Sequence, residues 1–194
     1  MLSIPEDLHC FLVTGLLNFK YFKAKAPEVI ARFLAEGKTP SCVYFNVRNF
    51  HTYNETYGFS GGDRMLRSIG RILQETFPYG VVSRFEADHF VAITGQQELG
   101  EKIKRMSVRI NNIRRGVIVE MKAGVYEVKD SAVDIGTIID CARLACEGIK
   151  RKYGTTVQFY EGRMDEKVQL QEHIIREFSG AVEAGLVKVY FQPV

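Results

Sequence analysis

Two short apolar segments with only three residues between them constrain the fold of this chain most. The segments are VVSRF, residues 81–85, and HFVAIT, residues 89–94, and Glu86, Ala87 and Asp88 separate them. Each segment has the length and apolar content of a β-strand, and so short a connection is typical of a tight antiparallel hairpin. The sequence therefore predicts antiparallel pairing at this point of a sheet.

The rest of the chain up to Tyr160 alternates between helix and strand patterns. Apolar residues recur at helical spacing over 20–36, 63–77, 97–114 and 133–150, and a shorter helix is predicted over 49–57. Short apolar runs predict further strands over 41–47, 117–128 and 156–160. Helices packed on one sheet of this kind make an α+β domain. We therefore expect an α+β fold with a central, mostly antiparallel sheet flanked by helices.

The composition changes after Tyr160. Residues 163–184 form one long charged amphipathic pattern, and VKVYFQPV, 187–194, has the pattern of a strand. We expect three parts: a domain over 1–161, a connecting helix over 162–185, and the first strand of a truncated second domain over 186–194. The apolar stripe of the helix predicts self-association of the chain. Packing of the helix back onto its own domain is the alternative.

Composition and charge exclude several classes of partner. A net charge of +3 on 194 residues is too small to predict nucleic-acid binding. The basic residues between 102 and 115 predict a solvated helix face, with an anionic partner as the alternative. No apolar run reaches the ~20 residues that a membrane span requires, so we expect no direct membrane contact. The four cysteines form no CxxC pair, and without a secretory signal they predict a cytoplasmic protein.

Three segments, in order along the chain, carry a more specific pattern. They are TGLLNFKYF at 14–22, FNVRNFHTYNETYGFSGGDRML at 45–66, and DCARLACEGIKRKYG at 140–154. Together they resemble the GGDEF domains, the diguanylate cyclases of bacterial signalling, over roughly residues 8–161. The resemblance implies a nucleotidyl-cyclase palm-like domain. The final VKVYFQPV resembles the first strand of EAL domains, the cyclic-di-GMP phosphodiesterases that often follow GGDEF domains.

The signature turn departs from the family pattern. The family has Gly-Gly-Asp/Glu-Glu-Phe at the hairpin, where this chain has Glu86-Ala87-Asp88-His89-Phe90. Glycines let the backbone approach a triphosphate, whereas Ala87 adds a methyl group and Glu86 adds a like charge. The resemblance assigns metal binding to position 46, here Asn46, and to Asp88, the one expected ligand that keeps its carboxylate. Since Mg²⁺ prefers anionic oxygen ligands, we expect weak metal binding, no catalytic residue, and no detectable cyclic-di-GMP synthesis.

The resemblance also implies a nucleotide site. It places Asn54 and Asp63 at a guanine base, whose edge an amide and a carboxylate can recognise. Capping of helix ends is the alternative role for both residues. It places Lys150 at the phosphates, with an ordinary surface lysine as the alternative. The implied ligand is GTP with Mg²⁺, bound weakly. The Arg-x-x-Asp that binds the product in the family is replaced at positions 77 and 80 by Phe and Gly, so we expect no cyclic-di-GMP binding there.

Three functions in cyclic-di-GMP signalling follow from the resemblance. The first is a degenerate, cyclase-inactive GGDEF domain that regulates an EAL phosphodiesterase in the same full-length chain, or that forms a homodimer. The second is a weakly active diguanylate cyclase that converts two GTP to cyclic di-GMP. The third is a scaffold that binds no nucleotide. GTP titration with and without Mg²⁺ distinguishes them, because a bound ligand raises thermal stability.

Overall fold

The computed structural model describes residues 13–95, 97–113, 116, 119–129 and 132–162. The chain divides into two compact units, Met1–Tyr160 and Glu161–Val194. The amphipathic helix predicted over 163–184 and the strand predicted over 186–194 lie outside the described residues, and so does the self-association expected from that helix. Among the described helices, none is long and apolar enough to cross a membrane.

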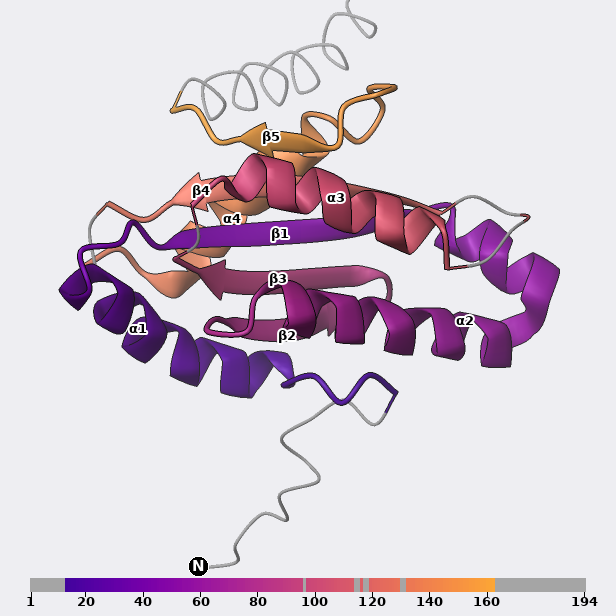
Figure 1. Cartoon of the computed structure of the whole chain (residues 1–194), viewed down its shortest axis with the longest axis horizontal. Helices are drawn as coiled ribbons and strands as arrows, with labels where there is room; N and C mark the ends of the chain where they lie inside the picture. The colour runs from indigo at the N-terminus through magenta and orange to yellow at the C-terminus, as the bar shows by residue number, and fades with distance from the viewer. Residues whose placement is uncertain (1–12, 96, 114–115, 117–118, 130–131, 163–194) are drawn as a thin grey trace, which may run out of the picture. The chain divides into compact units, whose positions relative to one another are not determined.

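Five strands form one sheet in the order β2-β3-β1-β4-β5 (Figure 1). Their bounds are β1 Ser41–Arg48, β2 Val81–Glu86, β3 His89–Thr94, β4 Glu120–Glu127 and β5 Val157–Phe159. β1 pairs antiparallel with both β3 and β4, β2 pairs antiparallel with β3, and β5 runs parallel to β4. The predicted hairpin and the predicted mostly antiparallel α+β architecture are both confirmed.

In the described part of the chain, four helices cover the two faces of this sheet. They are α1 Phe19–Ala35, α2 Phe50–Thr76, α3 Leu99–Asn111 and α4 Ile135–Glu147. Figure 1 shows α2 and α3 in front of the sheet and α4 behind it. The alternation of side chains along β1 explains the two layers. Val43, Phe45 and Val47 join the core under α2 and α3, whereas Cys42 and Tyr44 join the core under α1 and α4.

The range of α2 contains both predicted helices. The sequence predicts helices over 49–57 and 63–77, and Phe50–Thr76 consists of two helical segments that meet at a kink at Gly58, where the backbone is not helical. Gly58 has φ 69° and ψ 166°, a backbone conformation that costs glycine little because it has no Cβ. The helical backbone is therefore interrupted at Gly58, as the sequence predicts, although the second segment begins before residue 63. As a result Asn54 and Asp63 lie on the two sides of one kink.

The other helices and strands agree with their predicted ranges to within a few residues at each end, which is the usual precision of such boundaries. Two of the dispersed cysteines, Cys42 and Cys146, are buried in the core, as their apolar surroundings predict. Burial raises the pKa of the Cys42 thiol and raises the pKa of Cys146 to about 12. Both side chains therefore stay neutral thiols at physiological pH.

Candidate functional site

The β2–β3 hairpin is held from two directions. Its register pairs Arg84 with Phe90 and Glu86 with His89, with an irregularity between Arg84 and Glu86. The Arg84 guanidinium donates two hydrogen bonds to the Ala87 carbonyl, from Nε at 2.8 Å and from Nη2 at 2.5 Å. From the neighbouring strand β1, the Val47 amide donates to the Asp88 carbonyl at 3.1 Å. The turn is therefore fixed to its own strand and to β1.

Ala87 carries backbone strain in this turn. Its φ is 38°, in the left-handed region where a Cβ is unfavourable. We expect Ala87→Gly to stabilise the domain by about 1 kcal/mol, because glycine adopts this conformation without the steric cost. Urea unfolding followed by circular dichroism measures the change.

The matched control is Ala24→Gly. Ala24 lies exposed within α1, where the same exchange should destabilise by about 1 kcal/mol because glycine is a poor helix former. The two substitutions should therefore have opposite signs. If Ala87→Gly destabilises as much as Ala24→Gly does, the turn is not strained.

The residues at the expected metal position contact one another. Asn46 and His89 are register partners on β1 and β3, and the Asn46 side-chain amide contacts Nε2 of His89. His89 Nδ1 lies 3.8 Å from a Glu86 carboxylate oxygen and 3.9 Å from Asp88 Oδ1. Within the described part of the chain, no group of three or more His, Cys, Asp and Glu side chains could hold a metal ion. The residues present therefore do not fit Mg²⁺, which needs several oxygen ligands in octahedral geometry.

Asn54 does not cap a helix. It lies within α2, and its Oδ1 atom is buried without a hydrogen-bond partner among the described residues. The side chain packs closely on Gly62, where an added Cβ would overlap Oδ1 and lie 3.1 Å from Phe50 Cζ. The capping interpretation is therefore wrong for Asn54. An unpaired buried acceptor of this kind is costly unless a donor reaches it.

Asp63 belongs to the same electrostatic group as the hairpin. Burial lowers the pKa of Arg84, while the carboxylates of Asp63 and Asp88 act in the opposite direction. The carboxylates of Asp63 from α2 and Asp88 from the turn thus act on the same guanidinium. Arg84 therefore couples two of the residues predicted from sequence electrostatically.

Lys150 lines a cavity of about 310 Å³ on the α4 side of the sheet. The same cavity is lined from the sheet by Asn46, Glu86 and His89. Its other lining residues are Tyr44, Phe85, Asp140, Arg143, Cys146 and Glu147. Arg143 pairs with Asp140 at 3.0 Å and lies 3.7 Å from Glu147. The structure therefore places Lys150 with the metal-position residues, but among carboxylates that repel a phosphate.

Lys122 is a site residue that sequence reasoning missed. It is the register partner of Asn46 on β4 and is fully buried. Its ammonium contacts a Glu120 carboxylate oxygen at 2.5 Å and donates to the carbonyls of Lys152 at 2.8 Å and Thr155 at 2.6 Å. Glu120 also accepts from Arg48 Nη1 at 3.1 Å. A lysine within an otherwise apolar strand was the signal that could have revealed it.

The positions of the family's product clamp are closed. Phe77 is 2% exposed and packs in the core beneath α2 and α3. A Cβ at Gly80 would overlap the Ile93 carbonyl oxygen, so no larger side chain fits there without a backbone shift. Neither position can present a charged group to a phosphate, as the sequence predicted.

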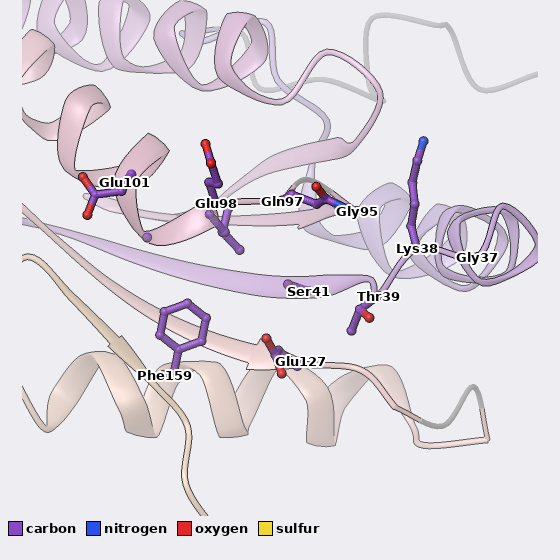
Figure 2. A pocket seen from close by; sticks show the side chains of 12 residues that line it. Gly37, Lys38, Thr39, Ser41, Gly95, Gln97, Glu98, Glu101, Glu127 and Phe159 are labelled. Carbon is purple, nitrogen blue, oxygen red and sulfur yellow. The ribbon is translucent and has the colours of Figure 1, made fainter.

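A larger cavity, of about 580 Å³, lies at the opposite end of β1 and β3 from the hairpin. Its lining includes Ser41, Gly95 and Phe159 together with Lys38 and three glutamates. Figure 2 shows these charged side chains dispersed around the rim, with Glu101 and Lys38 on opposite sides. The cavity therefore presents no converging set of polar groups.

Comparison with known proteins gives a consistent result. The family model for the diguanylate cyclase GGDEF domain matches residues 12–155. The cyclic di-GMP phosphodiesterase PdeB of Shewanella oneidensis is 23% identical over 194 residues, which cover 94% of this chain and 22% of PdeB. The chain thus spans about a fifth of the length of that curated relative.

Solved structures share the fold. The GGDEF domain of DgcB from Caulobacter crescentus, in complex with c-di-GMP, matches with a TM-score of 0.69 and 18% identity, covering 81% of this chain and 98% of that one. The S helix-GGDEF-EAL structure of Vibrio cholerae LapD, bound to c-di-GMP, matches with a TM-score of 0.66 and 17% identity, covering 89% of this chain and 43% of that one. At these identities the likeness concerns the fold.

Proposed function

The chain belongs to the GGDEF family, and on that basis we propose that its GGDEF domain is a regulatory module that makes no cyclic di-GMP itself. The observation that carries the proposal is the Asn46–His89 contact at the expected metal position. Phosphoryl transfer depends on metal ions that neutralise charge and position the reacting groups. Asn46 offers a neutral amide and His89 an imidazole, and the two side chains contact each other. They therefore provide no anionic oxygen ligands for such a metal ion.

The hairpin supports the same proposal. Ala87 places a methyl group, and Glu86 a carboxylate, where a bound triphosphate would approach the turn. Glu86 is two-thirds exposed and lines the cavity that contains Lys150. The negative charge of Glu86 repels a phosphate group and so opposes the attraction of that phosphate to Lys150. The turn residues therefore weaken substrate positioning, in addition to the loss of metal ligands.

We propose GTP as the regulatory ligand, bound without turnover. The buried Oδ1 of Asn54 has no partner in the described part of the chain, and the N1–H or N2–H₂ group of a guanine is a suitable donor. Asp63, held near Arg84, adds a second acceptor. A scaffold without nucleotide is the outcome if GTP fails to bind.

The proposed partner is an EAL domain in the same full-length chain. PdeB carries the name of a cyclic di-GMP phosphodiesterase, and the LapD structure contains a GGDEF domain together with an EAL domain. VKVYFQPV at 187–194 resembles the start of such a domain. The regulatory signal would pass along residues 162–185, in a cytoplasmic protein. A homodimer through the same segment is the second candidate partner.

The test is incubation of the 194-residue chain with GTP and either Mg²⁺ or Mn²⁺, with chromatography of the products. We expect no cyclic di-GMP above a blank without protein. Calorimetry in parallel should show GTP binding, and Asn54→Ala should weaken it by about tenfold, since one lost hydrogen bond to a buried group costs about 1–3 kcal/mol. Product formation by the unaltered chain would refute the proposed inactivity.

A matched variant shows that the assay can detect activity. It combines Asn46→Asp, Glu86→Gly, Ala87→Gly and His89→Glu, which return the family's residues at the metal and phosphate positions. Any product made by this variant and not by the unaltered chain assigns the inactivity to these four positions.

A further inference from the structure

We infer that this site works without a divalent metal. Asn46 and His89 join β1 directly to the hairpin, and the cationic cluster of Arg48, Glu120 and Lys122 supplies positive charge beside them. Divalent cations should then neither stabilise the domain nor strengthen its affinity for GTP. The expectation about GTP affinity rests on the proposed function, whereas the expectation about stability does not.

The strands β1 and β3 are closed on each other at Asn46 and His89. Asn46 is 6% exposed and its side-chain nitrogen faces Nε2 of His89. One strand position further on, the backbone bond from Val47 to the Asp88 carbonyl continues the tie. The two strands are thus connected directly at this point by a side-chain contact and a backbone hydrogen bond. A metal ion bound by both strands would have to displace the Asn46–His89 contact.

Asn46 has positive charge on its other side. Its register partner on β4 is Lys122, so the two side chains lie on the same face of the sheet. Arg48 follows on the same face of β1 and pairs with Glu120, its own register partner. The cluster therefore holds two cations and one anion. Its excess positive charge repels a divalent cation at Asn46.

The carboxylates of the hairpin do not reverse this balance. The carboxylates of Asp88 and Asp63 both act on the half-buried guanidinium of Arg84. Glu86 is largely exposed, and its carboxylate lies 3.8 Å from His89 Nδ1. On the α4 side, Arg143 pairs with Asp140 and lies near Glu147. Asp140 and Glu147 thus have a cation beside them, and within the described residues the carboxylates near the site do not form a group that could hold a metal ion.

The consequence for GTP follows from the charge of the ligand. Free GTP carries more negative charge than its Mg²⁺ complex. Although the carboxylates of the cavity repel phosphate, the excess positive charge of Arg48 and Lys122 beside Asn46 attracts the more negative species more strongly. Affinity for GTP in EDTA should therefore equal or exceed the affinity in Mg²⁺. A site that uses a metal bridge would show the opposite order.

The first test uses metals alone. Thermal unfolding of the 194-residue chain is measured in MgCl₂, in MnCl₂ and in EDTA at equal ionic strength, and electron paramagnetic resonance measures free Mn²⁺. We expect the same Tm in all three buffers and no protein-bound Mn²⁺. A saturable rise in Tm, or saturable Mn²⁺ binding, would overturn the inference.

The second test restores the missing ligands. Asn46→Asp combined with His89→Glu should bind Mn²⁺ and raise the Tm in its presence, whereas Asp140→Asn, an exchange in the same cavity, should leave the chain insensitive to metal. If the double variant does not fold, Asn46→Asp alone, which keeps the shape of the side chain, is titrated in its place. If a folded variant still does not bind Mn²⁺, then Asn46 and His89 are not the residues that prevent metal binding.

The third test separates the inference from the proposed function. GTP is titrated by calorimetry in EDTA and in MgCl₂. Equal or tighter binding in EDTA supports the inference, and binding that requires Mg²⁺ overturns it. If GTP binds in neither buffer, the proposed ligand is wrong, and the metal titrations alone decide whether the site is metal-independent.

Discussion

Gly124→Ala should destabilise the domain by about 3 kcal/mol, which for a domain of this size corresponds to a Tm lower by about 10 °C. Gly124 lies in the middle of β4, directly beneath α4. A Cβ at this position would overlap the Ala142 carbonyl oxygen and the Cys146 amide nitrogen, and would lie 2.9 Å from Cys146 Cα. All three atoms belong to helix backbone, so no side-chain rotation can relieve the overlap. The helix as a whole must move away from the sheet.

The displacement should also reach the cavity on this side of the sheet. Lys150 follows Cys146 by four residues, just beyond the end of α4, and both line the cavity with Asn46. We therefore expect Gly124→Ala to weaken GTP binding as well as stability, if GTP binds there. Thermal unfolding followed by circular dichroism, with calorimetry at a temperature where the variant is folded, measures both effects.

Gly100→Ala is the matched control for this prediction. Gly100 lies in the first turn of α3, where an added Cβ would make an ordinary contact of 3.7 Å with Phe159 Cε2. Alanine favours helix over glycine, so this exchange should stabilise by about 0.5–1 kcal/mol. If Gly124→Ala is as well tolerated as Gly100→Ala, α4 does not pack on β4 at backbone distance.

The fold was predictable from sequence because its signals are local. The hairpin follows from a three-residue connection, and each helix follows from apolar residues at helical spacing. The break at Gly58 was also predictable, since a glycine follows the first apolar helical pattern, and its φ of 69° interrupts the helical backbone there. The start of the second segment was less accessible, because residues 59–62 carry little apolar periodicity.

The site was predictable as a set of positions and not as a set of contacts. Asn46, Asp88 and Lys150 were identified from their place in the pattern, and Lys150 and Asn46 do line one cavity. The contacts depend on side-chain geometry across separate elements. Asn46 contacts His89 on the neighbouring strand, and Asn54 packs against Gly62 with its Oδ1 atom unpaired among the described residues. Lys122 was missed for the same reason, because its partners are main-chain carbonyls about thirty residues away.

Lys122→Met should destabilise the domain by about 3 kcal/mol, although methionine fills a similar volume. The ammonium is fully buried and has three partners, one carboxylate and two carbonyls. Methionine donates no hydrogen bond, so the carbonyls of Lys152 and Thr155 lose their donor. The loop that connects α4 to β5 should then loosen. Urea unfolding of the unaltered chain and of Lys122→Met measures the lost free energy of unfolding. The dependence of that free energy on urea concentration should be the same for both proteins.

Lys104→Met is the control for the chemical exchange itself. Lys104 pairs with Glu101 at 2.8 Å, but both side chains are more than half exposed. Exposed ion pairs contribute little, so this exchange should change stability by less than about 0.5 kcal/mol. The contrast between the two lysines isolates the contribution of burial.

A double-mutant cycle with Glu120→Gln then identifies which partner of Lys122 matters most. If the ion pair dominates, Lys122→Met and Glu120→Gln together should cost less than the sum of the two single losses, since each removes the same interaction. If the carbonyls dominate, the losses should add, because Glu120→Gln leaves the bonds to Lys152 and Thr155 in place. A Lys122→Met variant as stable as Lys104→Met would show that the ammonium holds none of its three partners, and would also remove Lys122 from the positive charge beside Asn46.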